Sequence, residues 1–469
     1  MLKLRFLRFT PLALAMGLAL VALGCGNGAN KPITMATAAN TQIKIGDSPA
    51  DSVLALDVTI TQVVLVQQDG TKVSVPDLPK KIELTHLAGT VESFVTPNVP
   101  PGTYQSAAIS VSTVDVSYIP ASSTTPVEKT FTPNTTVTVM FSPAVTIGKE
   151  PTVLSFDFNA AQSLTFDSAG NVTGINPVIT VSVQVVSAGG QEDDEEHGEI
   201  EDMVGTISAV TPASGSMAAS FALTPESGGS AETFSVDANT KFDDGISQFA
   251  DLKKGMLVEV DGITQTDGSL LATKVELMEA SNGMEADGIV TATSGSPVTS
   301  VKLLVQDEAG NMTTGMVGTT LTVDVSNAVF KSPLSNSDFS MLLEGLPFTP
   351  KFDNTTVAVG QRIQVNAPET SQMQSSFAAS QVRLQRQALT GTVGPAAMGS
   401  NASFSLLLDA DSAFAKLTNV SSVNVYQVSR TQEMSPAAPG TKIRVRGLLF
   451  FDGTNYQFVA ARVAKPEAD

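Results

Sequence analysis

The fold is decided by an alternating stretch near the start of the chain, Leu56-Asp57-Val58-Thr59-Ile60-Thr61. Apolar and polar residues alternate here with a period of two, which places one set of side chains on the buried face of a β-strand. The parity changes near Gln62, where Val63 and Leu65 become the apolar positions, and this change predicts a bulge or a bend. The stretch therefore predicts a long, half-buried strand.

Similar runs continue over residues 41–188, separated by turn signals such as Pro100-Pro101-Gly102-Thr103. The further candidate strands are Lys72–Val75, Ile82–Thr85, Val91–Val95, Ser106–Ile119, 137–141, 154–158 and 179–185. No convincing long helix interrupts them. The pattern predicts an antiparallel β-sandwich over residues 41–188.

The beginning of this region resembles a known family. Ile45-Gly46-Asp47-Ser48-Pro49-Ala50-Asp51, followed by Val58–Val63, is similar to the opening of bacterial lipoproteins that carry domain of unknown function 4382. Pro101-Gly102-Thr103-Tyr104 matches a turn of that family, which recurs in prealbumin-like β-sandwiches. The resemblance implies a prealbumin-like sandwich on a surface lipoprotein, and it brings no catalytic residues.

An acidic run, QEDDEEHGEIED at Gln191–Asp202, breaks the strand pattern. Repulsion between like charges keeps such a run extended and hydrated, so residues 189–202 are predicted to be a linker. Its carboxylates could condense cations weakly, and the candidates are Glu192, Asp193, Asp194, Glu195 and Glu196. The run lacks the spacing of an EF-hand loop, so no specific metal site is predicted.

After the linker, three landmarks recur in the same order in units at residues 203–280, 286–388 and 389–469. Each unit opens with a glycine-containing strand, continues with a glycine-led strand and closes on an alanine-containing strand. The first unit, with Asp251–Gly255 and Val260-Asp261-Gly262, resembles domain of unknown function 5666, which implies a small OB-like barrel. The repeat predicts three OB-like β-barrel units, with Val258, Ile363 and Ile443 pointing inward at equivalent positions.

The N-terminal residues predict where the protein resides. A basic start and an apolar run from Pro11 to Leu23 indicate a secretory signal at residues 1–24. The stretch Val21-Ala22-Leu23-Gly24-Cys25 resembles a lipoprotein signal box, which predicts acylation of Cys25 and a flexible tether at residues 25–40. Gly26 after the cysteine favours the outer membrane. The alternative is an ordinary signal peptide with an incidental cysteine.

Composition argues against several classes of function. The formal charge of −19 disfavours a nucleic-acid partner. Two histidines, His86 and His197, stand far apart in the sequence and make a transition-metal site improbable. The sequence lacks a nucleophile elbow, a P-loop and a zinc-protease motif, and no cofactor is expected.

Few aromatic platforms are present for glycans, because the chain has no tryptophan and four tyrosines, at Tyr104, Tyr118, Tyr426 and Tyr456. Basic residues cluster in the third unit, at Lys442, Arg444, Arg446 and Arg462. We expect a noncatalytic, exported protein, lipid-anchored in the cell envelope, that scaffolds or binds an extracellular ligand. The alternative is an envelope enzyme of the hydrolase type that uses paired carboxylates.

Overall fold

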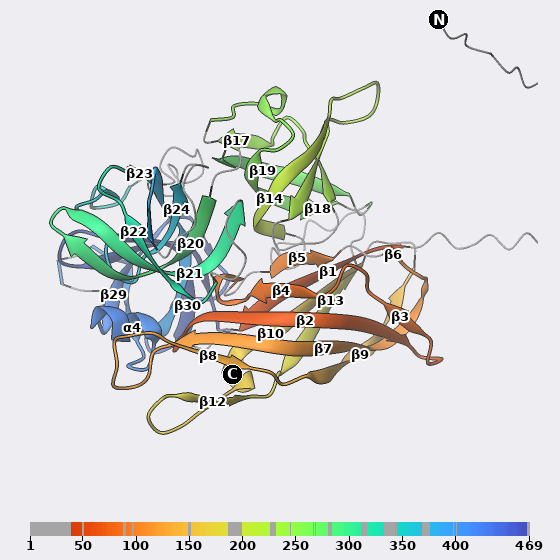
Figure 1. The fold of residues 1–469 in the computed structure, drawn as a ribbon, viewed down its shortest axis with the longest axis horizontal. Helices are drawn as coiled ribbons and strands as arrows, with labels where there is room; N and C mark the ends of the chain where they lie inside the picture. The colour runs from red at the N-terminus through yellow and green to blue at the C-terminus, as the bar shows by residue number, and fades with distance from the viewer. Residues whose placement is uncertain are drawn as a thin grey trace, which may run out of the picture. The chain divides into compact units, whose positions relative to one another are not determined.

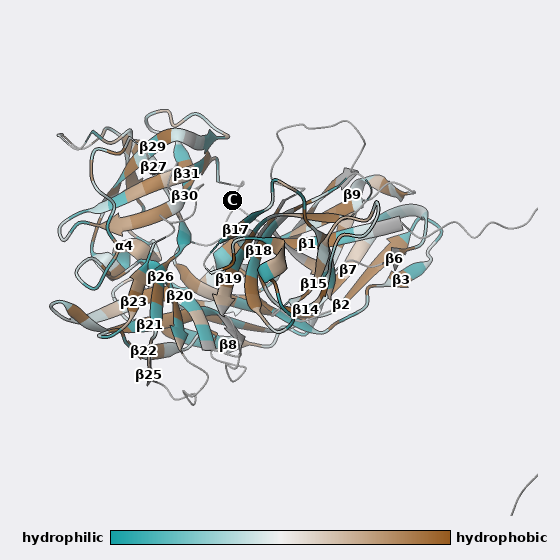
Figure 2. Cartoon of the chain, turned by 90° about the horizontal axis from the view of Figure 1, so that it is seen from above, coloured by the Kyte–Doolittle hydropathy of each residue, from teal (hydrophilic) through white to brown (hydrophobic). Residues whose placement is uncertain are grey.

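The alternation seen in the sequence becomes strands throughout the chain (Figure 1), and the predicted all-β class is confirmed. The computed structural model describes residues 39–48, 51–87, 91–95, 98–148, 152–185, 199–225, 231–243, 245–265, 267, 269–279, 284–310, 317–332, 343, 345–367, 376–396, 398–399 and 401–466. Cys25 and Glu192–Glu196 lie outside the described residues. Strands such as β30 are coloured mainly hydrophobic in Figure 2, as expected of segments that bury at least one face.

The first region is a sandwich of two sheets with one shared hydrophobic core. One sheet contains β1 (Ala39–Ser48), β5 (Val91–Val95), β6 (Asn98–Val99), β10 (Thr152–Asn159) and β13 (Ile179–Val185). The other contains β2 (Val53–Gln67), β3 (Lys72–Ser74), β4 (Lys80–Glu83), β7 (Gly102–Tyr118), β8 (Val127–Phe131) and β9 (Thr135–Ile147). The 3-10 turn η1 (Thr85–Leu87) follows β4, and α1 (Ala160–Ser163) leads into the hairpin of β11 (Leu164–Phe166) and β12 (Val172–Ile175).

Strand β2 behaves as its sequence predicts. Leu56, Val58 and Ile60 are buried, the register with β7 shifts between Ile60 and Gln62, and the buried parity then passes to Val63. The prediction of a purely antiparallel sandwich was wrong in one place, because β1 and β10 pair in parallel. These strands are separated by the whole second sheet, so no hairpin constrains them to run in opposite directions.

The first of the three later units contains β14 (Glu199–Thr211), β15 (Ser220–Pro225), β16 (Glu232–Ser235), β17 (Lys241–Asp243), η2 (Phe249–Asp251), β18 (Leu257–Thr264) and β19 (Leu270–Glu279). The pairing order is β16-β15-β14-β18-β19, and parallel pairing of β16 with β19 joins its ends into a ring. Ile200 is buried in this core, and β14 begins at Glu199. Residues 199–202, predicted as linker, therefore belong to a barrel strand.

The second and third units repeat this pairing. The second contains β20 (Met284–Gly295), β21 (Val298–Gly310), β22 (Thr320–Asp324), β23 (Val329–Lys331), β24 (Arg362–Ala367), β25 (Ser376–Ala378) and β26 (Gln381–Leu384). The third is a closed barrel of β27 (Arg386–Gly394), β28 (Phe404–Leu408), β29 (Ser422–Glu433), β30 (Lys442–Phe451) and β31 (Tyr456–Ala464), with α4 (Ala413–Thr418) after β28.

In the third unit the first strand pairs with the second and fourth, and the third pairs in parallel with the fifth, which is the arrangement of an OB-like barrel. The second unit departs from a continuous barrel. Its β25 and β26 together take the place of β19, and residues 379–380 interrupt the ladder between them.

The predicted equivalence of three inward residues agrees with the strand registers. Val258 lies opposite Gly205, Ile363 opposite Gly288, and Ile443 opposite Gly391. All three apolar side chains are buried in the cores of their own units.

The glycine-led strands share a second landmark. Gly255, Gly360 and Gly440 have φ values of 91°, 87° and 82°, a left-handed conformation that favours glycine. Their amides donate to the carbonyls of Ile207, Val290 and Val393 in turn, each at 2.8 Å. The glycine therefore recurs because each unit contains the same type of turn at this position.

Residues 37–469 form one compact unit. No helix among the residues described above is long and apolar enough to cross a membrane.

Candidate functional site

A small apolar cluster lies where the sandwich meets the second and third OB-like units. Leu54 and Ile119 come from the sandwich, Leu304 from β21, and Ala413 and Leu417 from α4. These side chains exclude water from the contact between the three parts. The cluster is separate from the main core of each part.

Polar contacts cross the same junction. The Gln306 side chain of β21 donates through Nε2 to the Leu54 carbonyl oxygen at 2.7 Å and to Thr85 Oγ1 at 2.9 Å. The Ala413 amide at the start of α4 donates to the Asp51 carbonyl oxygen at 2.7 Å. Lys416 Nζ donates to the Ile119 carbonyl oxygen at 2.9 Å. These hydrogen bonds hold the sandwich, strand β21 and helix α4 together at the junction.

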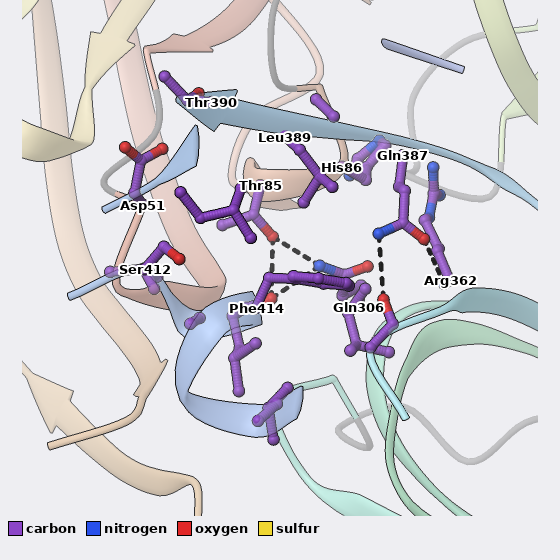
Figure 3. A pocket seen from close by; sticks show the side chains of 18 of the residues that line it. Asp51, Thr85, His86, Gln306, Arg362, Gln387, Leu389, Thr390, Ser412 and Phe414 are labelled. Atoms are coloured by element: carbon purple, nitrogen blue, oxygen red, sulfur yellow. Dashed lines mark hydrogen bonds between the residues drawn. The ribbon is translucent and has the colours of Figure 1, made fainter. Parts of the chain in front are cut away.

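These contacts surround a cavity of about 110 Å³ (Figure 3). Its polar and charged lining residues are Asp51, Thr85, His86, Gln306, Arg362, Gln387, Thr390, Ser412 and Arg444, and its apolar residues include Leu389, Leu408 and Phe414. In Figure 3, Asp51, Thr390 and Ser412 lie on one side, and Gln306 and Gln387 lie on the other. Residues of the sandwich and of the second and third OB-like units therefore line the same cavity.

Gln306 lines this cavity and carries a buried acceptor without a partner in the described chain. The residue is 5% exposed, and its Oε1 makes no hydrogen bond with the described part of the chain. The orientation of the amide is fixed because Nε2 faces the Leu54 carbonyl, which can only accept. A buried, unpaired acceptor costs about 1–3 kcal/mol, so this oxygen favours any donor that enters.

Arg444 presents a charged donor to the same cavity. Its side chain is 7% exposed, and its Nε makes one long hydrogen bond to Thr390 Oγ1 at 3.5 Å. Its two terminal nitrogens have no hydrogen-bond partner among the residues that the structure describes. A guanidinium offers five donors in a planar fork that fits a carboxylate, so most of its binding capacity is unused here.

Asp51 modulates the charge beside Arg444. Burial raises the pKa of the Asp51 carboxyl, against the opposing effects of Lys442, a Thr390 hydrogen bond and Arg444. Lys442 Nζ lies 3.9 Å from Asp51 Oδ2. The region therefore contains both signs of charge, which disfavours a multiply charged anion.

The other cavity residues are committed to protein contacts. Arg362 Nε donates to Asp287 Oδ1 at 2.6 Å, and its amide donates to Gln387 Oε1 at 2.8 Å. The ring Nδ1 of His86 lies 3.1 Å from Oε2 of the buried Glu83, and this hydrogen bond helps to lower the Glu83 pKa against the larger effect of burial. His86 is thus bound to a structural carboxylate, as its position beside a short strand suggests.

Several residues singled out in the sequence occupy structural places. Tyr104 is buried and donates to the Pro100 carbonyl oxygen at 2.7 Å, and Tyr456 donates to the Val359 carbonyl oxygen at 2.6 Å. His197 lies outside the described residues, as do Cys25 and the acidic run Glu192–Glu196. Of the basic cluster in the third unit, only Arg444 lines the cavity.

Several aspartates in the described regions serve as turn acceptors. Asp69, Asp167, Asp267 and Asp452 each accept a backbone amide two residues further on, and these hydrogen bonds lower their pKa values. Asp51 is the one carboxylate that lines the cavity. No group of three or more His, Cys, Asp or Glu side chains in these regions could hold a metal ion.

The sequence singled out Arg444 only as one of a basic cluster, and it gave no reason to choose Gln306. Both lie on strands whose cavity-facing positions depend on how the sandwich docks against the later units. A polar residue within an alternating strand is the only signal available from sequence, and surface positions produce the same signal.

Comparison with known proteins supports both resemblances found in the sequence. Residues 38–175 match the family described as Domain of unknown function (DUF4382), and residues 204–276 match Domain of unknown function (DUF5666). A comparison with curated proteins finds no match. The solved structure drosophila Unr CSD456 shares 12% sequence identity, with 57% of this chain and 98% of that chain covered, at a TM-score of 0.14. The OB-like description rests on the strand pairing alone.

Proposed function

We propose that this chain is a noncatalytic protein of the cell envelope that binds a small extracellular ligand in the junction cavity. The observation that carries the proposal is the pair of unused groups there, the Arg444 guanidinium and Gln306 Oε1. Leaving such groups without a hydrogen-bond partner destabilises the folded protein. A ligand that pairs with them removes this free-energy cost, and that contribution favours binding.

The proposal places the protein at the membrane through lipid on Cys25. The basic start, the short apolar run and the box ending in Cys25 support this location. Two or three acyl chains anchor a protein stably, whereas one binds only marginally. The residue after the cysteine is Gly26, which favours the outer membrane.

The anchor is tested by expressing the full chain and its Cys25→Ala variant in a bacterial host and fractionating the cells. The full chain should sediment with membranes, and the variant should move to the soluble fraction. Equal membrane retention of both proteins would refute the anchor and leave the cavity proposal untouched.

The alternative of an envelope enzyme finds one supporting observation, in the sandwich. Asp57 and Asp115 lie opposite each other on β2 and β7, and burial raises the pKa of Asp57 to about 7. Lys81 Nζ lies between them, 2.7 Å from Asp57 Oδ2 and 3.2 Å from Asp115 Oδ2. A lysine bridging both carboxylates favours an ion-pair network, and neither carboxylate lines the cavity.

Ligand binding is tested by a thermal-shift screen of the full chain against small organic acids, amino acids, sugars and divalent cations. At least one class should raise the melting temperature of the wild type and leave that of Arg444→Met unchanged. A screen in which no compound shows this dependence on Arg444 would contradict binding in the cavity.

A further inference from the structure

We propose that the junction cavity takes a small carboxylate that carries a neighbouring hydrogen-bond donor, such as an α-hydroxy or α-amino acid. This inference deepens the proposed function and rests on it. It follows from which groups in the cavity are unused, where they lie, and how much space separates them.

The charged end of the ligand is set by Arg444. Its terminal nitrogens have no hydrogen-bond partner in the described chain, and a planar guanidinium matches the two oxygens of a carboxylate. Thr390, directly opposite Arg444 in the β27–β30 ladder, places a hydroxyl beside the same position. A neutral hydroxyl on the ligand would leave the positive charge largely uncompensated in a partly dry site.

The second end is set by Gln306, whose side chain lies on the other side from Asp51 and Thr390 (Figure 3) and whose Oε1 is unpaired. An amide oxygen can only accept, so the ligand must supply an O–H or N–H group there. A simple aliphatic carboxylate such as propionate would satisfy Arg444 and leave Gln306 unpaired. The two unused groups together require a ligand with both functions.

Size limits the ligand further. A volume of about 110 Å³ holds roughly seven to eleven waters, so it has room for a small organic molecule. L-lactate and L-alanine are small enough to fit within this volume. The apolar wall of Leu389, Leu408 and Phe414 suits a methyl or other short aliphatic group.

Other ligands of similar size are disfavoured by the charges present. Inorganic phosphate would bring its second negative charge close to Asp51, the carboxylate on the Arg444 side of the cavity. A divalent cation would meet Arg444 instead of a cluster of carboxylates. The mixed charge fits a single carboxylate best.

The test is isothermal titration calorimetry of the full chain with six compounds: L-lactate, L-alanine, propionate, L-lactamide, glucose and inorganic phosphate. Lactate or alanine should bind at least tenfold more tightly than propionate, which lacks the donor, and than lactamide, which lacks the carboxylate. Arg444→Met should reduce binding of lactate and alanine at least tenfold. Lys72→Met, an exposed change on β3, should leave it unaltered.

A second variant separates the two ends. In Gln306→Met the affinity for lactate should fall to that for propionate, while the affinity for propionate stays as in the wild type. Circular dichroism and melting temperature establish that each variant is folded, and if Gln306→Met does not fold, the probe series on the wild type and on Arg444→Met decides alone.

The outcomes distinguish the inference from the function beneath it. Binding of glucose or phosphate with dependence on Arg444, without binding of lactate or alanine, would overturn the ligand class and keep the cavity as a binding site. No binding of these six compounds to the folded wild type would overturn the inference. An empty result in the wider thermal-shift screen would also overturn the proposed function.

Discussion

The first and third OB-like units use the same strand position in two ways. Val258 and Ile443 occupy equivalent inward places, and each is followed by a buried residue on the opposite face of the strand, Glu259 and Arg444. Glu259 lies 4.0 Å from Lys274 of its own unit. The terminal nitrogens of Arg444 have no such partner in the described chain and face a cavity.

The second unit supports the same distinction. Its equivalent outward residue, Gln364, donates to Glu285 Oε1 at 2.8 Å within the same unit. The inward residue is fixed by the barrel and stays apolar in all three units. The outward residue does not pack in the barrel core, so its type can differ between units. It can form a protein contact in one unit and bind a ligand in another. The comparison therefore predicts large stability effects for inward changes and small ones for Arg444.

The largest effect is expected from Ile443→Asp, because it buries an unpaired charge in the barrel core. Such a change costs several kcal/mol, enough to unfold a marginal unit. Hydrogen exchange on the full chain should show lost protection over residues 442–464 and retained protection over 257–279. The neighbouring change Arg444→Met serves as the control, and an equal loss in both variants would break the distinction between the two faces.

Smaller but parallel losses are expected from Gly205→Ala and Gly391→Ala. An added methyl group would lie 2.6 Å from the Thr224 carbonyl oxygen in the first unit and 2.5 Å from the Leu407 carbonyl oxygen in the third. Such overpacking costs about 1–3 kcal/mol. Chemical denaturation should show similar losses in both variants, whereas Gly174→Ala, with nothing within 4 Å, should be nearly neutral. A loss of stability in only one of the two variants would argue against a strand arrangement shared by the two units.

The strand arrangement shared by the three units could be predicted from the sequence because the signals for it lie within short stretches of the chain. Alternation identified β2, and the three glycine-led strands identified the repeat, since each glycine serves a left-handed turn within its own unit. The parallel pairing of β1 with β10 was missed because it joins distant strands. The cavity was missed for the same reason, because Gln306 and Arg444 meet only when separate parts dock.

A pH effect is expected from Asp57, the buried carboxylate in the sandwich. Its pKa is about 7 in the folded chain against 3.8 when unfolded, because burial disfavours the charged form. The folded chain therefore holds a proton that the unfolded chain releases between these values, and stability from this group falls as pH rises from about 4 to 7. Asp57→Asn should remove that fall, so the stability of the variant relative to wild type should be greater at pH 8 than at pH 4, by about 1–2 kcal/mol.

The measurement is the melting temperature of wild type and Asp57→Asn across this pH range. Asp69→Asn, a change at an exposed turn whose pKa is lowered by hydrogen bonds to Thr71, is the control. Identical pH profiles for wild type and Asp57→Asn would show that Lys81 keeps Asp57 ionised throughout. In that case Asp57 would resemble Glu259, a charged side chain that lies near a lysine. It would differ from Arg444, whose terminal nitrogens have no hydrogen-bond partner in the described chain.

The smallest effect is expected from Ser412→Ala at the start of α4, the helix that forms part of the cavity wall in the third unit. Ser412 Oγ accepts from the Ala415 amide at 3.1 Å and caps the helix. Loss of such a cap costs about 1 kcal/mol. The melting temperature should fall slightly, and exchange should rise over residues 413–418. An unchanged exchange rate there would show that packing against the sandwich holds α4 without its cap.

The central claim is that three parts of the chain form one ligand site, and hydrogen exchange with and without saturating L-lactate tests it most directly. The account predicts slower exchange together at residues 85–87 of the sandwich, 304–306 of the second unit and 413–418 of the third, with no change over residues 257–279 of the first unit. Protection of only one of the three segments, or equal protection of the first unit, would contradict a shared site at the junction.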